Sequence, residues 1–304
     1  MKTELYQKRL TPTATTRIVK PAAYFILLLL TYTVGYLSAP SSTSQPQLTS
    51  AVTVTNPSPP SSPGDQIPGS FRVTTSCADP IPSELVRQTL LDRLFNGSSP
   101  FQDFPPEHAA KLLRPTRVKG WGSNGAVFEN LIRRVNPRTI VEVGTFLGAS
   151  ALHMAELTRK LGLQTQIICV DDFRGWPMFL DRFKNLPMVN GDVLLFYQFM
   201  QNVVSLNKTG SIIPVPFSSG SALTMLCQMG VLADLVEIDA GHDFLSAWTD
   251  INRGHRILRP GGVLFGHDYF TAADNRGVRR AVDLFARVNG LKVRVDGQHW
   301  VMDS

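Results

Sequence analysis

Hydrophobic and polar positions follow two alternating rhythms over the second half of the chain. Short runs rich in Ile and Val predict buried strands, and the segments between them place apolar residues three and four positions apart, which predicts helices. The predicted strands are 139–143, 166–170, 212–216, 234–239 and 263–266, followed by 291–295 and 299–302 around a turn at 296–297. This alternation predicts a doubly wound, mostly parallel seven-stranded α/β sheet that ends in an antiparallel hairpin.

The N-terminal part of the chain has a different pattern. Residues 22–39 carry no charge and are centred on an apolar run at 25–30, which is about the minimum length for a transmembrane helix. Five basic residues and one acid precede this stretch, so the positive-inside rule places the N-terminus in the cytosol. We therefore expect a basic tail (1–21) and a retained signal anchor (22–39) in a single-pass type II membrane protein. A signal peptide cleaved after the small residues Ser38 and Ala39 is the alternative.

The rest of the chain divides by composition. Residues 40–75 are rich in Ser, Thr and Pro, which predicts a disordered stalk, and residues 76–304 form the predicted globular domain. A segment at 173–207 interrupts the strand–helix alternation, and we expect a substrate lid there, with ordinary amphipathic packing as the alternative. A short anchor suits the thinner membranes of the ER and Golgi. The sequons at Asn96 and Asn207 are glycosylation sites if the domain is lumenal.

The charge distribution limits the kinds of partner that the protein can bind, and the cysteine content limits its disulfides. The formal net charge is +6, but most of it belongs to the N-terminal tail, so we expect no nucleic-acid partner. Three cysteines allow at most one disulfide within the chain. We expect Cys169 and Cys227 to be small buried apolar groups, and Cys77 to pair between chains or to stay free.

The chemistry centres on the segment 139–150, a strand that ends in an acid and is followed by two glycines before a helix begins. Gly144 and Gly148 permit a sharp turn, and the helix start offers free N–H groups to a ligand. The glycine spacing differs from that of the dinucleotide-binding motif. The segment resembles the first motif of class I S-adenosylmethionine (SAM)-dependent methyltransferases. The resemblance covers residues 118–302 and implies a SAM site built from this segment: Glu142, Gly144, Thr145, Gly148 and Ser150.

Two later strand ends extend the expected cofactor site. Asp171 follows the second strand about twenty residues after the glycine turn, where an acid can accept hydrogen bonds from a ribose diol. Ser219 follows the third strand, at the position that usually faces the adenine in such folds, although it can equally cap the helix. Trp121 and Ser123 lie in a glycine-rich loop before the first strand. A glycine-rich turn with a packing tryptophan is the favoured interpretation of this loop, and a role of the two residues in the pocket is the alternative.

A second cluster follows the fourth and fifth strands. Asp239 and His242 end one strand and His267 and Asp268 end its neighbour, so a parallel sheet brings the four side chains together at one edge. The pattern resembles the macrocin-type sugar O-methyltransferases. That resemblance implies Mg²⁺ held by Asp239 and Asp268, with His242 as general base. Asp239 also lies at the strand ends where SAM is expected to bind, so we expect it to contact the cofactor as well.

Departures from that group leave alternatives open. One potential carboxylate is missing at 240–241, and His267 stands where an acid is common. His267 could bind a softer metal, or either histidine could act as the base without a metal. Helix capping by Asp239 and Asp243 is the structural alternative, with His267 as a buried hydrogen-bonded side chain.

We therefore expect a SAM-dependent O-methyltransferase that acts in the Golgi or ER on a sugar, polyol or phenolic hydroxyl. The expected partners are a small-molecule or glycan acceptor and the membrane, and the oligomeric state stays open. A non-catalytic SAM-binding scaffold and an NAD(P)-dependent oxidoreductase are the alternatives, and the glycine spacing disfavours the second.

Overall fold

The computed structural model describes residues 76–176 and 186–304. The predicted tail, anchor and stalk therefore lie outside the described residues. Within the described residues, no helix has both the length and the apolar content needed to cross a membrane. The helices are η1 (Ser83–Leu85), α2 (Val86–Phe95), α3 (Glu107–Ala110), α4 (Ala126–Val135), α5 (Ala149–Lys160), α7 (Leu195–Ser205), α8 (Ser219–Gln228), α9 (Phe244–Arg256) and α10 (Ala273–Asn289).

A seven-stranded sheet forms the centre of the domain, as predicted. Its order is β5-β2-β1-β6-β7-β9-β8, with β1 to β7 in this sheet mutually parallel and β9 antiparallel to both β7 and β8. The strands are β1 (Thr139–Val143), β2 (Gln166–Val170), β5 (Ile212–Val215), β6 (Ala233–Ile238), β7 (Leu258–Gly266), β8 (Arg294–Asp296) and β9 (His299–Asp303). A separate short hairpin joins β3 (Met188–Val189) to β4 (Asp192–Val193).

Strand β7 starts earlier than the sequence predicted. The predicted strand begins at residue 263, but α9 ends at Arg256 and the strand begins at Leu258. The strand can include Pro260 and Gly261 because its register against β6 shifts between Ala233 and Leu235, which leaves this stretch irregularly paired.

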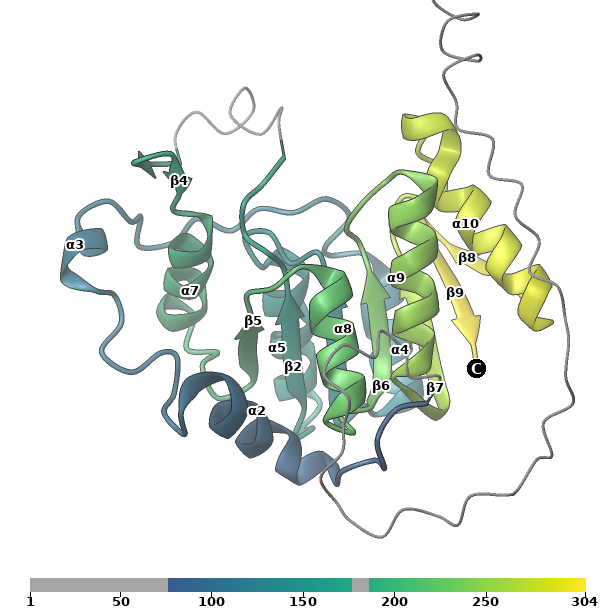
Figure 1. Cartoon of the computed structure of the whole chain (residues 1–304), viewed down its shortest axis with the longest axis horizontal. Coiled ribbons are helices and arrows are strands. Elements are labelled where there is room, and N and C mark those ends of the chain that lie inside the picture. The colour runs from purple at the N-terminus through teal and green to yellow at the C-terminus, as the bar shows by residue number, and fades with distance from the viewer. Residues whose placement is uncertain (1–75, 177–185) are drawn as a thin grey trace, which may run out of the picture. The chain divides into compact units, whose positions relative to one another are not determined.

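Helices cover both faces of the sheet, and α8 and α9 lie in front of it in Figure 1, with α4 and α5 behind. One face packs against α2, α8, α9 and α10 through residues such as Leu90, Leu226 and Ile251. The other face packs against α4, α5 and α7 through Phe128, Met154 and Phe199. Because both faces are covered, the strands are buried nearly throughout, which explains their continuous apolar runs.

Helix α7 belongs to the core, so the packing alternative holds for this part of the predicted lid. Phe199 is fully buried, and the side chains of Gln198 and Asn202 are fully buried as well. Asn202 donates to the backbone oxygens of Arg117 (2.8 Å) and Leu147 (3.0 Å), which ties α7 to the loop after β1. Residues 177–185 of the predicted lid lie outside the described residues.

The cysteine prediction was wrong for two of the three residues. Cys77 and Cys227 form a disulfide within the chain, while Cys169 is free and buried in β2 as expected. Backbone hydrogen bonds from Ala78 to Cys227 (3.0 Å) and from Ile81 to Gly230 (2.9 Å) lay the N-terminal segment along the end of α8. The two cysteines are 150 residues apart, so only this tertiary contact reveals the pair.

Candidate active site

The loop after β1 has the tight geometry that its glycines predict. Gly144 adopts φ 96°, and a Cβ there would overlap the backbone carbonyl of Asp239 at the end of β6. Gly148 adopts φ 82° at the start of α5, and a Cβ there would meet the ring of Phe199. Both positions need a left-handed backbone and have no space for a side chain. Each position therefore requires glycine for two separate reasons.

Glu142 shapes this loop from within the protein. Its carboxylate is fully buried and accepts hydrogen bonds from the hydroxyls of Thr145 (2.6 Å) and Ser150. Burial raises the pKa of Glu142, and the two hydroxyls oppose that rise. The structure therefore shows Glu142 holding both ends of the glycine loop. The predicted contact of this acid with the methionine part of SAM stays a prediction.

Asp171 also binds the glycine loop. Its carboxylate accepts the backbone N–H of Phe146 (2.8 Å) and that of Phe173 (2.7 Å), while Asp172 accepts from the backbone of Arg174. Burial raises the pKa of Asp171, and these N–H donors lower it. A carboxylate offers about four lone pairs, so these two bonds leave acceptor capacity for a ribose diol.

Glu237 is a buried acid that the sequence analysis missed. It lies opposite Glu142 in the β1–β6 register, is 1% exposed, and one of its carboxyl oxygens has no hydrogen-bond partner among the described residues. Burial, and then the neighbouring Glu142, raise the pKa of Glu237 well above its usual range. The folded protein therefore favours the protonated form of Glu237 more than the unfolded chain does. A second acid within the strand 233–238, after Asp234 near its start, was the available signal.

We expect Glu237→Gln to stabilise the domain at pH 8. A carboxyl whose pKa is raised by folding binds more protons in the native state, so its contribution to stability is lost as pH rises above the unfolded value of about 4.3. Glutamine keeps the shape without this titration. Thermal unfolding of both proteins from pH 5 to pH 8 should show the variant's advantage growing with pH, by roughly 2–4 °C for each kcal/mol. A difference that is the same at every pH would contradict the assignment.

Four predicted catalytic side chains meet where β6 and β7 end. His242 Nε2 lies 2.9 Å from Asp268 Oδ2, and His267 Nδ1 lies 3.3 Å from the same oxygen. His267 Nδ1 also lies 3.8 Å from Asp239 Oδ1. The prediction that neighbouring parallel strands bring these groups together is confirmed as geometry, while their roles in catalysis stay predictions.

The electrostatics of this cluster favour a charged Asp268 between two imidazoles. Hydrogen bonds from His242 and His267 overcome the effect of burial and hold the pKa of Asp268 well below its usual range. The hydrogen bond to Asp268 raises the pKa of His242. Burial raises the pKa of Asp239 to about 7, with the Asp268 charge adding to that rise and His267 opposing it. One carboxylate is thus firmly ionised and the other titrates near neutrality.

The same cluster has a donor set that fits a divalent cation. Asp239, His242 and Asp268 each offer one ligand atom, and these atoms lie within 4.8 Å of one another. Two carboxylates and an imidazole suit a hard or borderline ion. His267 is not part of this set, although the sequence analysis considered it as a ligand.

Two other predicted polar groups have structural contacts. Asp243 caps α9 by accepting the backbone N–H groups of Leu245 and Ser246, each at 3.0 Å, which confirms the capping alternative for this residue only. Ser219 begins α8, and its side chain hydrogen bonds to Asp250. Its predicted adenine contact stays a prediction.

The sequence analysis also missed His299, at the start of β9. The residue is 3% exposed, and its ring centroid lies 4.8 Å from that of His267. Burial lowers the pKa of His299 to about 4, so its ring is neutral at physiological pH. A neutral ring packed against His267 helps to fix the imidazole that contacts Asp268. Its position in the terminal hairpin gave no sequence signal, because only the fold brings β9 beside β7.

Three aromatic rings meet at the glycine loop. Trp121, from the loop before α4, lies 5.6 Å from Phe146 between ring centroids, and Trp176, which follows β2, lies 5.8 Å from Phe146. The two tryptophans remain 43% and 38% exposed. Trp121 thus packs against Phe146 and Trp176, as the alternative of a packing tryptophan expects, and its role in a pocket stays a prediction. Ser123 from the same loop is buried, and its hydroxyl donates to the Trp121 carbonyl.

A family model described as a methyltransferase domain matches residues 141–269, from the glycine loop to the end of the β7 cluster. This stretch of the chain is thus similar to a methyltransferase domain. The predicted superfamily is thus confirmed. The matched region includes residues of the predicted SAM site and of the β6–β7 cluster: Glu142, Asp171, Ser219, Asp239, His242, His267 and Asp268.

Solved structures resemble the methyltransferase domain at low sequence identity. The O-methyltransferase of Bacillus cereus, solved with SAH, is 18% identical with a TM-score of 0.43, and the match covers 72% of this chain and 96% of that one. A putative caffeoyl-CoA O-methyltransferase from Staphylococcus aureus is 13% identical with a TM-score of 0.45, covering 72% and 99%. A comparison with curated proteins finds no match.

Proposed function

We propose that the methyltransferase domain transfers a methyl group from SAM to a hydroxyl oxygen of a sugar, polyol or phenolic acceptor. The observation that carries this proposal is the contact between His242 and Asp268 beside Asp239, at the same sheet edge as the glycine loop. An imidazole oriented by a carboxylate is a general base of the kind that removes a hydroxyl proton. The pattern of these residues supports the macrocin-type sugar O-methyltransferases as the subgroup.

The chemistry follows from this arrangement. SAM supplies the methyl group, and the glycine loop with Asp171 would hold its polar parts. Because His242 Nε2 contacts Asp268, the acceptor oxygen would give its proton to the other ring nitrogen, Nδ1, as it attacks the methyl carbon, and the sulfur would leave as SAH. Asp268 stabilises the imidazolium that forms. Holding both reactants in line is the larger part of the rate gain.

A divalent cation is the second element of the proposal. Asp239, His242 and Asp268 would hold it, and it would supply charge that lowers the pKa of an acceptor hydroxyl. The two roles of His242 compete, because an imidazole nitrogen that binds a cation cannot accept a proton. A measurement of whether activity depends on a metal would therefore distinguish between the two roles of His242.

Calorimetry tests cofactor and metal together. Purified protein is titrated with SAM in millimolar MgCl₂ and again in EDTA. We expect SAM binding in both buffers, with Asp171→Asn weakening it. An absence of binding in both buffers would sink the enzyme proposal. Transfer activity that survives EDTA would remove only the cation and leave His242 as the base.

The open aromatic cluster supports a ring-shaped acceptor. Trp121 and Trp176 expose ring surface beside the glycine loop, and such faces stack on sugars and phenols. A Trp121→Ala variant should raise the KM for the acceptor while the SAM affinity stays unchanged. An equal loss of SAM affinity would assign Trp121 to the cofactor site instead.

We also propose that the domain acts in the lumen of the secretory pathway, held by the predicted N-terminal anchor. Support comes from the Cys77–Cys227 disulfide, a bond that persists in oxidising compartments. Both sequon asparagines, Asn96 and Asn207, are exposed at left-handed turns after helices. Two measurements on the full chain in microsomes test this placement. The domain should be protected from added protease, and its mass should decrease on treatment with a glycosidase.

Loss of the disulfide should destabilise the domain. We expect Cys77→Ser to lower the free energy of unfolding by roughly 2–5 kcal/mol, because the bond closes a loop of about 150 residues. Denaturant unfolding of protein from an oxidising host measures the difference. Cys169→Ser is the control for a cysteine outside any disulfide. Peptide mapping without reductant should recover Cys77 joined to Cys227, and a Cys169-containing pair would contradict the assignment.

A further inference from the structure

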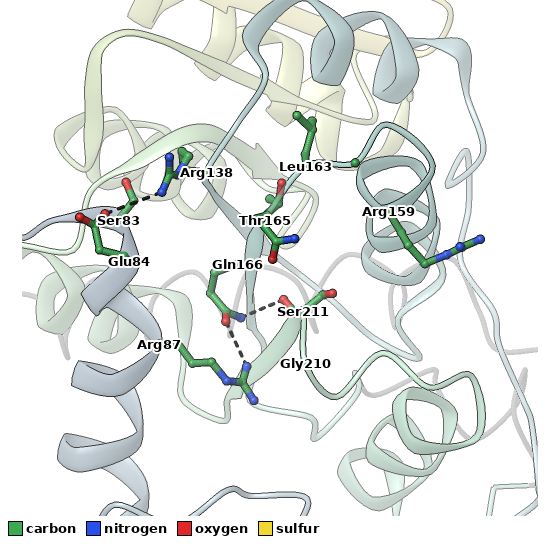
Figure 2. A pocket seen from close by; sticks show the side chains of 12 residues that line it. Ser83, Glu84, Arg87, Arg138, Arg159, Leu163, Thr165, Gln166, Gly210 and Ser211 are labelled. Atoms are coloured by element: carbon green, nitrogen blue, oxygen red, sulfur yellow. Dashed lines mark hydrogen bonds and ion pairs between the residues drawn. The ribbon is translucent and has the colours of Figure 1, made fainter.

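A second cavity lies at the ends of the strands opposite to the candidate active site. Its volume is about 350 Å³, and it is lined where β1, β2 and β5 begin. Figure 2 shows Arg87 from α2 and Arg138 just before β1 among its labelled side chains, together with Gln166 and Ser211. None of its lining residues belongs to the SAM site or to the β6–β7 cluster.

Arg87 carries a charge that no carboxylate of the described residues pairs with. Its guanidinium donates to the side-chain oxygen of Gln166 (3.0 Å) and to the carbonyl of Thr209 (2.8 Å), and no carboxylate among the described residues lies within ion-pair distance. The residue is partly buried, and burial lowers the pKa of its guanidinium. A cation taken from water without a counter-charge is costly, and an anion in the adjoining cavity would offset that cost.

Arg138 adds a second cation to the same cavity. Its guanidinium lies 3.9 Å from Glu84, and both side chains are more than half exposed, so this pair contributes little. The backbone N–H of Arg138, and not its side chain, makes the structural bond to Asp234 (2.7 Å). Arg159 also lines the cavity but is paired with Glu156 at 2.6 Å.

Neutral donors and open space complete the cavity. Ser83 and Ser211 lie on its wall, and neither hydroxyl has a hydrogen-bond partner within the described parts of the chain. Gly162 and Gly210 also line it, and a Cβ at either would meet no atom within 4 Å. Two guanidinium groups with hydroxyl donors match the acceptor oxygens of a tetrahedral oxyanion.

We propose that this cavity is a binding site for a sulfate or phosphate group, free or as a monoester on a sugar. Arg87 and Arg138 bind the oxygens of the group, and Glu84 competes with it for Arg138. The site is independent of methyl transfer, because it lies at the other ends of the strands.

The test uses the folded protein with sodium sulfate and sodium phosphate up to about 20 mM, with NaCl holding the ionic strength constant. We expect a saturable rise in Tm of roughly 3–6 °C at ten times Kd. Galactose 6-sulfate and glucose 6-phosphate are titrated in parallel. Tighter binding of the monoesters than of the inorganic ions assigns the site to a modified glycan, and equal binding assigns it to the free ion.

Five variants make the test decisive. Arg138→Gln should weaken binding roughly fivefold, and Glu84→Gln should tighten it, because one removes a cation and the other removes its competitor. Arg87→Gln removes the other cation. If this variant fails to fold, Arg87→Lys, which keeps the charge, takes its place in the test. Arg133→Gln, in an exposed pair with Glu129 on α4, is the control and should bind as the wild type does. A Tm rise that does not saturate, or that is equal in all variants, overturns the proposal.

Discussion

Gly144→Ala should abolish SAM binding and destabilise the domain by roughly 3–5 kcal/mol. An alanine here must adopt φ 96° while its Cβ overlaps the carbonyl of Asp239. The overlapping atoms are backbone, so no rotamer change relieves the clash. Strands β1 and β6 would have to separate at the edge where the glycine loop meets Asp239. Denaturant unfolding and SAM calorimetry measure the two effects.

Gly162→Ala is the matched control for this prediction. Gly162 also adopts a positive φ, 69°, but a Cβ there meets no atom within 4 Å. We expect a cost of about 1–2 kcal/mol from the left-handed backbone alone, with unchanged SAM affinity. If the two variants lose the same stability and both bind SAM, the close approach between the glycine loop and β6 does not matter for the cofactor site.

His242→Ala should lower kcat by about 10²–10⁴, the range for loss of a general base, while SAM affinity stays within twofold. The rate is measured as SAH formation with an acceptor that the wild type methylates, in MgCl₂ and in EDTA. His108→Ala is the control, because this exposed histidine on α3 contacts Tyr197 and no group of the cluster. Full activity of His242→Ala would favour the non-catalytic scaffold or a different base.

The pH profile gives an independent check on the same residue. His242 must be neutral to accept a proton, and the hydrogen bond to Asp268 raises its pKa, so activity should rise with pH through a value above about 6.5. In Asp268→Asn the largest cause of that rise is gone and burial, which lowers the pKa, remains. The acidic limb should therefore move to lower pH while the rate falls. An unchanged limb in this variant would show that another group sets the profile.

Much of the fold follows from local pattern alone. A few neighbouring residues are enough to predict three kinds of feature. These are the apolar runs at β1 and β2, the glycines at 144 and 148, and the acids at the strand ends. Parallel strands then place Asp239, His242 and Asp268 at one edge without further information. For this reason the sheet and the proximity of the predicted catalytic groups could be predicted.

Contacts between distant segments could not be predicted in this way. The disulfide of Cys77 with Cys227 depends on the N-terminal segment reaching the end of α8, and the packing of His299 against His267 depends on β9 pairing beside β7. The second cavity likewise needs Arg87 from α2 and Arg138, just before β1, in its lining. Sequence alone determined most strands of the main sheet and the glycine turn, because these follow from short-range backbone and side-chain preferences. Tertiary structure alone decided which distant side chains meet, because packing in three dimensions leaves no periodic trace along the chain.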